Sequence, residues 1–206
     1  MQHTALRVLV VLGALAAAVA GFYLARHVDR AAPTLASGTW YPQARPWAEF
    51  SLTDGNGAAF TRANLLGHPT LVFFGFTHCP DVCPTTLLKL AQARKAAAVP
   101  GLKVLFVSID PERDTPEVVG RYVRAFDPQF QGVTGDPHAV ATLARGVGVA
   151  VSRVELPGGD YTMDHSAVVF LLDARAQVVA IFTPPFDVRL MAQDLKASAP
   201  YLEGGH

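Results

Sequence analysis

The longest apolar stretch of the chain lies close to its N-terminus. Val8 to Ala25 is a run of 18 residues without a charged side chain. About 20 apolar residues cross a bilayer as a helix, so this run is close to the length of a transmembrane signal anchor. The alternative is a cleaved signal peptide, with Ala18-Val19-Ala20 as its small-residue cleavage site. The run exceeds the ~7–15 residues of a signal-peptide core, which favours the anchor.

Both interpretations place the rest of the chain outside the cytoplasm. We therefore divide the sequence into a short N-terminal tail (1–7), a transmembrane signal anchor (8–25), a linker (26–46) and a soluble domain (47–203). The linker is assigned because the stretch up to Pro46 contains three prolines and little periodicity. The total of 206 residues suits one domain behind a targeting segment.

Short apolar runs alternate with helix-type segments in the soluble part. Strands are expected over residues 50–52, 58–60, 70–76, 103–109, 147–155, 166–172 and 177–182. Helices are expected over residues 84–98, 116–126, 137–145 and 188–199, with Thr115, Asp136 and Asp187 as N-caps. Turn-forming residues at 54–57 and 173–176 predict two β-hairpins, the second at an antiparallel edge of the sheet.

This order predicts an α/β domain of three layers. It is also similar to the thioredoxin pattern, with an added N-terminal β-hairpin and an inserted helix. The expected fold is therefore thioredoxin-like, preceded by one N-terminal transmembrane helix.

The charge balance and the number of cysteines each exclude a class of protein. Lys plus Arg and Asp plus Glu number 17 each, so no basic field exists to attract nucleic acid. The chain has only two cysteines, Cys79 and Cys83. A disulfide-stapled secreted scaffold would carry more cysteines, spread along the chain, so these two are interpreted as a functional pair.

The cysteines lie in a C-x-x-x-C motif between the apolar strand 70–76 and the following helix. The unpaired N–H groups at a helix start stabilise anions, so we expect the cysteine pKa to fall below its free value of ~8.5. Side chains at i and i+4 of a helical turn lie ~5–6 Å apart at Cβ. Such a pair can exchange disulfides, act as a nucleophile or bind a soft metal.

His165 is the candidate third member of the site. It directly precedes the apolar strand that begins at Ala167. In thioredoxin-like folds the loop before this strand lies against the cysteine loop, where thioredoxins carry a cis-proline. The alternative is a turn histidine held by Asp164 or Ser166. His78 adjoins Cys79, but adjacent residues of an extended segment point opposite ways, so we do not expect it to share a metal with Cys79.

Two thiolates and one imidazole form a soft set that suits copper or zinc. A structural zinc site usually has four protein ligands, and here it would need Asp81, Asp164 or His78 as the fourth. A catalytic zinc with an open position is also possible. The ligand chemistry alone leaves copper somewhat ahead of zinc.

The sequence resembles the Sco/SenC family of copper chaperones. The resemblance rests on Phe74 to Pro84 (FGFTHCPDVCP), Ser108 to Pro116 (SIDPERDTP), and Asp164-His165-Ser166 with the strand that leads to Leu172-Asp173. It covers nearly the whole soluble part. The resemblance implies a copper site made by Cys79, Cys83 and His165, with Cu(I), Cu(II) or both as the ion. For the stretch from Asp110 to Asp114 we expect turn formation and helix capping, with a functional contact as the alternative.

The family implies a role in building the dinuclear copper centre of cytochrome c oxidase subunit II. Some members reduce the cysteines of that target instead. The expected partners are this subunit and a periplasmic copper donor or thiol reductant, with the protein in the inner membrane and its domain facing the periplasm. The alternative function is that of a thiol-disulfide oxidoreductase or peroxiredoxin-like enzyme that uses Cys79 and Cys83 as its redox pair. A copper sensor acting through a partner is a third possibility.

Overall fold

The structure is a computed structural model that describes residues 7, 12–15, 17–19, 21 and 32–203. The chain forms two units, Met1–Ala32 with His206 and Pro33–Gly205. In the first unit, residues 12–15 and 17–19 are helical. Most of the predicted anchor over 8–25 lies outside the described residues. Among the helices that are described, none combines the length and the apolar character needed to cross a bilayer.

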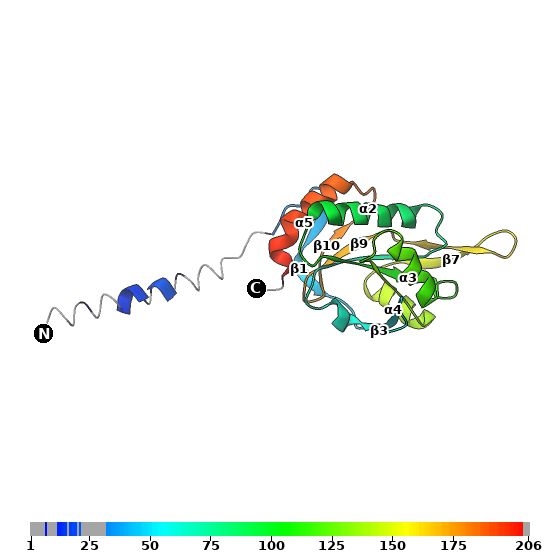
Figure 1. The fold of residues 1–206 in the computed structure, drawn as a ribbon, viewed down its shortest axis with the longest axis horizontal. Coiled ribbons are helices and arrows are strands. Elements are labelled where there is room, and N and C mark those ends of the chain that lie inside the picture. The colour runs from blue at the N-terminus through cyan, green and yellow to red at the C-terminus, as the bar shows by residue number, and fades with distance from the viewer. Residues whose placement is uncertain (1–6, 8–11, 16, 20, 22–31, 204–206) are drawn as a thin grey trace. The chain divides into compact units, whose positions relative to one another are not determined.

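Within residues 32–203, the second unit is built on an eight-stranded mixed sheet (Figure 1). The strand order is β1-β10-β9-β4-β5-β6-β2-β3. Strands β4, β5 and β6 run parallel, and the other pairs are antiparallel. A separate two-stranded sheet pairs β7 with β8. The strands are β1 (Gly38–Pro46), β2 (Ser51–Asp54), β3 (Ala59–Thr61), β4 (Thr70–Gly75), β5 (Lys103–Ser108), β6 (Gln131–Thr134), β7 (Val151–Glu155), β8 (Tyr161–His165), β9 (Val169–Leu172) and β10 (Gln177–Phe182).

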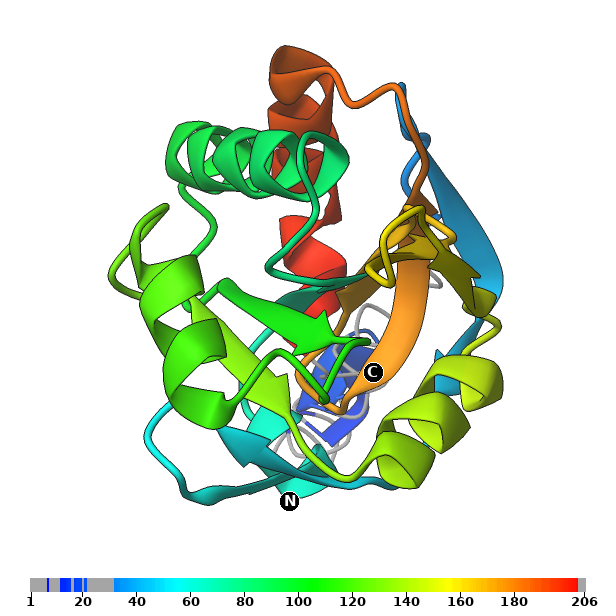
Figure 2. The ribbon, with the colours of Figure 1, turned by 90° about the vertical axis from the view of Figure 1, so that its right-hand side faces the viewer.

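Helices cover both faces of the large sheet. They are η1 (Arg62–Leu65), α2 (Val82–Ala97), α3 (Pro116–Arg124), α4 (Pro137–Gly146) and α5 (Val188–Leu202). Helices α2 and α5 pack side by side, and α4 lies across the sheet from them (Figures 1 and 2). The three predicted N-caps are confirmed, because Thr115, Asp136 and Asp187 each accept a hydrogen bond from a backbone N–H of the first turn.

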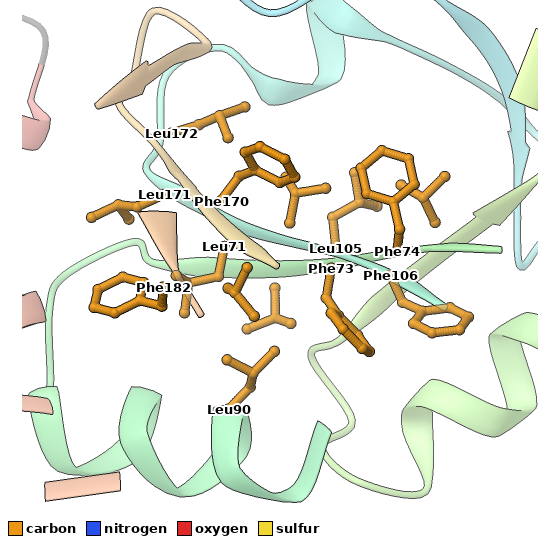
Figure 3. Packing of buried hydrophobic residues seen from close by; sticks show 14 of the residues in the cluster. Leu71, Phe73, Phe74, Leu90, Leu105, Phe106, Phe170, Leu171, Leu172 and Phe182 are labelled. Carbon is orange, nitrogen blue, oxygen red and sulfur yellow. The ribbon is translucent and has the colours of Figure 1, made fainter. Parts of the chain in front are cut away.

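The core lies around β4, whose six residues are all buried. This explains its uninterrupted apolar run, since a central strand covered on both faces has no polar side. Phe73 of β4 meets Phe106 of β5 with ring centroids 6.1 Å apart, and Leu90 of α2 approaches the same layer (Figure 3). The carboxyl end of β4 leads directly into the cysteine segment, so the core positions that segment.

Both predicted hairpins form, but the second one is not at an edge. β2 pairs with β3, and β9 pairs with β10, as expected. However, β9 also pairs with β4, and β10 also pairs with β1. The apolar composition of β9 agrees with an interior position, because all four of its residues are buried.

The linker predicted over residues 26–46 does not hold for Gly38–Pro46, which forms the edge strand β1. β1 pairs only with β10, and its register shifts between Trp40 and Arg45, a span that contains Pro42. An edge strand tolerates proline at such an irregularity, because one side of it makes no ladder bonds. The prolines therefore do not indicate a linker here.

Two short strands escaped the sequence pattern altogether. β6 is only four residues long (QGVT), and its apolar content is too low to predict a strand. β8 occupies a stretch that we expected to be a loop, and it pairs with β7. β7 itself was expected to begin at Val147 and begins at Val151. The resulting β7–β8 hairpin carries His165 at its end, so this difference bears directly on the site.

Candidate functional site

The two cysteines lie at the junction between β4 and α2, as predicted. Cys79 belongs to the segment before the helix, and Cys83 is the second residue of α2, which begins at Val82. Pro84 was expected at the first helical position and occupies the third. The first N–H groups of a helix have no intrahelical partner, so a proline fits anywhere in this turn.

The Cys83 side chain is fully buried beneath the sheet end. Its sulfur occupies space that only a glycine leaves free, because a Cβ on Gly75 would lie 2.9 Å from Cys83 Sγ. Burial raises the pKa of the Cys83 thiol above its ordinary value, and a hydrogen bond with the Phe76 backbone only partly opposes this effect. The predicted fall in pKa at the helix start is therefore wrong for Cys83, since desolvation outweighs the helix dipole.

Cys79 lies at the edge of the same site and is partly exposed. The backbone N–H of Cys83 donates a hydrogen bond to Cys79 Sγ, with an N···S distance of 3.3 Å. The stabilising contact of the helix start thus goes to the outer cysteine. Both thiols are free, with no disulfide between them.

His165, the last residue of β8, brings its ring to the buried cysteine. Its Nε2 atom lies 3.7 Å from Cys83 Sγ. Its Nδ1 lies 3.2 Å from the carbonyl oxygen of Ser166, and a carbonyl can only accept, so Nδ1 carries the proton. Nε2 is left with a lone pair facing the sulfur. This arrangement, a ring fixed through one nitrogen while the other is offered, is typical of metal-binding histidines.

The surroundings of His165 favour the neutral form of its ring. It is set edge-on to Phe73 and Phe76, at centroid distances of 6.1 and 6.3 Å. Burial lowers the pKa of His165, against smaller opposite effects of the Ser166 carbonyl and Asp164. A surface pocket of about 270 Å³ borders the ring and leaves it open to an approaching partner. The pocket is lined by Ala150, Val151, Ser152, Asp164, His165 and Ser166.

In the described residues, the His165 ring contacts the Cys83 side chain, and the Cys79 sulfur contacts the backbone N–H of Cys83. Within residues 32–203, no three His, Cys, Asp or Glu side chains already stand close enough together to hold a metal ion. Cys79 Sγ accepts the hydrogen bond from the Cys83 N–H, and the Cys79 side chain also interacts with the Cys83 thiol. A site with three protein ligands would require these two sulfur atoms and His165 Nε2 to close around one ion, and Cys79 is partly exposed, so it is not enclosed by the core.

His78 is engaged elsewhere. Its Nδ1 lies 3.2 Å from Thr77 Oγ1 and 3.7 Å from Asp114 Oδ1, and about half of its side chain is exposed. Asp81 accepts a hydrogen bond from Thr85 in the first turn of α2. These contacts give neither residue a bond to the sulfur atoms.

Asp114 is the residue of the site that sequence reasoning missed. Its carboxylate is buried and accepts hydrogen bonds from the Thr77 N–H (3.0 Å), Thr77 Oγ1 (2.5 Å) and Ser108 Oγ (2.6 Å). Asp114 thereby ties the cysteine segment to the end of β5. For Asp114, this contact with the cysteine segment goes beyond turn formation and capping. Thr77 follows the apolar strand β4 and Ser108 is the last residue of β5, and their polar character was the available signal.

The chain is similar to known proteins over most of the described domain. The sequence model of the family described as SCO1/SenC matches residues 41–199. The chain belongs to the SCO1/SenC family. Relatives in this family include the mitochondrial Protein SCO1 homolog 1 of Arabidopsis thaliana, 41% identical over 142 residues, and the human mitochondrial Protein SCO1 homolog, 39% identical over 142 residues. The matched regions cover 68% and 65% of this chain but only 42% and 46% of those relatives.

Solved structures of the SCO1/SenC family share the fold. ScoI of Arabidopsis thaliana with copper bound has 37% identity and a TM-score of 0.71, covering 75% of this chain and 98% of that chain. ScoI of Bradyrhizobium japonicum with copper bound has 41% identity and a TM-score of 0.67, covering 73% and 98%. The predicted thioredoxin-like α/β fold is thus confirmed for the described domain. The bound copper is a property of these two relatives.

Proposed function

We propose that this chain is a membrane-anchored copper chaperone that binds copper through Cys79, Cys83 and His165. One observation carries the proposal: the lone pair of His165 Nε2 faces Cys83 Sγ at 3.7 Å. Thiolates and imidazole suit copper. Membership of the SCO1/SenC family and the relatives solved with copper bound support copper over zinc.

Each ligand has a separate task in this proposal. Cys83 loses its proton when copper binds, and the ion replaces that proton between Sγ and His165 Nε2. His165 keeps its Nδ1–H on Ser166 and needs no deprotonation. Cys79 closes the site from its exposed side, where a thiol of the recipient can displace it. Stepwise ligand exchange then passes the ion on without releasing it to water.

The proposed recipient is cytochrome c oxidase subunit II, whose dinuclear copper site the chain would fill or whose cysteines it would reduce. A periplasmic copper donor or thiol reductant would act before it. We place the chain in the inner membrane with residues 8–25 as a single span and the domain facing the periplasm. The uncharged run of 18 residues and the family support this placement.

Copper affinity of the full-length chain in detergent tests the ligand set. We expect His165→Ala to weaken Cu(I) binding at least tenfold, equivalent to about 1.4 kcal/mol. His78→Ala is the matched control, because this ring adjoins Cys79 but contacts Thr77 and Asp114. Equal affinities of wild type and His165→Ala would remove His165 from the site.

Deletion of the gene tests the cellular role. We expect cytochrome c oxidase activity to fall and to recover partly when copper is added to the medium. Reintroducing the wild-type gene should restore activity, and reintroducing the Cys83→Ser form should not. Undiminished oxidase activity in the deletion strain would contradict delivery to this enzyme.

A thiol-disulfide reductase is the second candidate, and the bond from the Cys83 N–H to Cys79 Sγ favours it. This contact places a backbone hydrogen-bond donor at the exposed sulfur. Cys79 would attack the disulfide of a target, and Cys83 would then attack Cys79 and release the reduced target. Fast turnover of a generic disulfide by the metal-free protein would favour this function, and slow turnover would favour the chaperone.

A further inference from the structure

The β7–β8 hairpin, which carries His165, is not part of the eight-stranded sheet. β8 pairs only with β7, and the two strands form a sheet separate from the eight-stranded one. Figure 1 shows the hairpin that begins with β7 projecting from the rest of its unit. Among the described residues no ladder bond of β8 reaches the large sheet, so the position of His165 depends on its pairing with Val151, on the hydrogen bond from the Ser166 N–H to the Ala150 carbonyl, and on side-chain contacts of β8.

Tyr161, the first residue of β8, makes several of these contacts. The Cζ atoms of Arg113 and Arg153 each lie 3.7 Å from the centroid of its ring. Two guanidinium groups cannot both occupy this position on one face without overlapping, so they stack on opposite faces. A planar guanidinium is well suited to such stacking on an aromatic ring.

Hydrogen bonds also hold Tyr161, both at its hydroxyl group and at its backbone carbonyl. Tyr161 Oη donates to Asp110 Oδ1 at 2.7 Å, and Arg113 Nε donates to Asp110 Oδ2 at 2.6 Å. Arg113 Nη1 also donates to the backbone carbonyl of Tyr161 at 2.9 Å. Asp110 is almost fully buried. We call Tyr161, Arg113, Arg153 and Asp110 the Tyr161 clamp.

The clamp is coupled to the site along one strand. Tyr161 and His165 are the two ends of β8 and lie on the same face, because side chains at i, i+2 and i+4 share a face. Arg113 and Asp110 belong to the connection that also carries Asp114, which holds the cysteine segment. The two halves of the candidate site therefore meet through this connection.

We propose that the Tyr161 clamp is a positioning unit that holds His165 against Cys83. Arg113, Arg153 and Asp110 do not touch the metal in this proposal; they act through β8. The inference rests on the proposed function for its consequence on copper. Its structural part concerns the protein without metal and can be tested there.

The first test follows the His165 ring by ¹⁵N NMR in the metal-free full-length chain. Wild type should show one neutral ring with the proton on Nδ1. In Tyr161→Leu, which removes the stacked ring, we expect the two tautomers to average. Val154→Ala, on the neighbouring strand and outside the clamp, is the matched control and should leave the signal unchanged. An unchanged His165 signal in Tyr161→Leu would overturn the proposal.

Two milder variants guard against a general loss of folding. Tyr161→Phe keeps the stack and loses the bond to Asp110, and Arg153→Lys keeps the charge and loses the planar stack. Both should shift the His165 signal less than Tyr161→Leu does. If neither moves it while Tyr161→Leu unfolds the domain, the clamp is structural only and the proposal is wrong.

The second test measures the rate at which a Cu(I) chelator removes copper. Tyr161→Leu should raise this rate about tenfold in the wild-type background and less than twofold when combined with His165→Ala, since the effect acts through His165. Equal increases in both backgrounds would overturn the positioning role. A wild-type chain without copper affinity would refute the proposed function instead, and the NMR test would still decide on the clamp.

Discussion

Cys83 has its sulfur where a side chain at residue 75 would begin. A Cβ on Gly75 would lie 2.9 Å from Cys83 Sγ and 2.8 Å from Phe106 Cε2. Real Cβ contacts are not so short, so a larger residue at position 75 must displace the buried thiol or the Phe106 ring. This absence of a side chain at the end of β4 is what lets the Cys83 side chain enter the core.

Gly75→Ala is therefore expected to destabilise the domain by about 1–3 kcal/mol, the usual cost of overpacking a core. It should also weaken copper binding, because the displaced Cys83 thiol moves away from the His165 ring. Urea unfolding and Cu(I) affinity check these two effects. Gly146→Ala is the control, since its Cβ would meet only the Ala48 Cβ at 3.5 Å. Equal behaviour of the two variants would contradict the close approach.

The stability of the reduced, metal-free protein should fall as the pH rises above about 8.5. Burial raises the pKa of Cys83 in the folded chain. Above the ordinary thiol pKa of about 8.5, the unfolded chain loses a proton that the folded chain keeps, so rising pH favours unfolding. Urea midpoints measured between neutral and alkaline pH test this. Cys83→Ala should show a smaller alkaline loss, and an identical loss would refute the assignment to Cys83.

The same proton makes copper binding pH-dependent. Cys83 must release it before the sulfur can bind the ion, so the apparent copper affinity should rise with pH through the neutral range. Each thiol proton that is released on binding, from Cys83 or from Cys79, contributes about tenfold per pH unit. Competition with a Cu(I) chelator of known pH behaviour measures the slope. A flat profile would mean that Cys83 is not a ligand or that its proton is retained.

Asp114→Asn should loosen the segment that carries Cys79. Its carboxylate holds the N–H and the hydroxyl of Thr77. Loss of these charge-assisted bonds is expected to cost about 2 kcal/mol and to speed alkylation of Cys79. Asp127→Asn is the control, because Asp127 pairs with Arg94 near the surface. Unchanged Cys79 reactivity in Asp114→Asn would show that the hydrogen bonds from Thr77 to Asp114 do not hold the cysteine segment in place.

Asp194 fixes the start of β1, and its removal should release that strand. The buried carboxylate accepts hydrogen bonds from the N–H groups of Ala36 (2.6 Å), Ser37 (2.7 Å) and Gly38 (3.0 Å). We expect Asp194→Ala to cost about 3 kcal/mol, because several N–H groups lose a charged partner. Asp187→Ala, at the exposed N-cap of α5, should cost about 1 kcal/mol. Urea unfolding and proteolysis near residue 37 distinguish the two.

Much of the fold could be predicted because local patterns and long-range packing agree. The all-apolar strand β4 has to be central, since a strand without a polar face is buried on both sides. The caps at Thr115, Asp136 and Asp187 act through the adjacent turn, so they are visible in the sequence. β1 was missed for the opposite reason: its prolines indicate a linker locally, and only the pairing with β10 makes it a strand.

The sequence by itself determined the chemistry of the site: one thiol before a helix, a second thiol in its first turn, and an imidazole before an apolar strand. Only the tertiary structure decided how they meet. The contact between Cys83 and His165 joins residues 82 positions apart, and β8 delivers the ring along a hairpin that no local pattern predicted. The pKa of Cys83 was decided the same way. Helix position alone favours the thiolate, whereas burial under β4 disfavours it, and burial is a property of the whole fold.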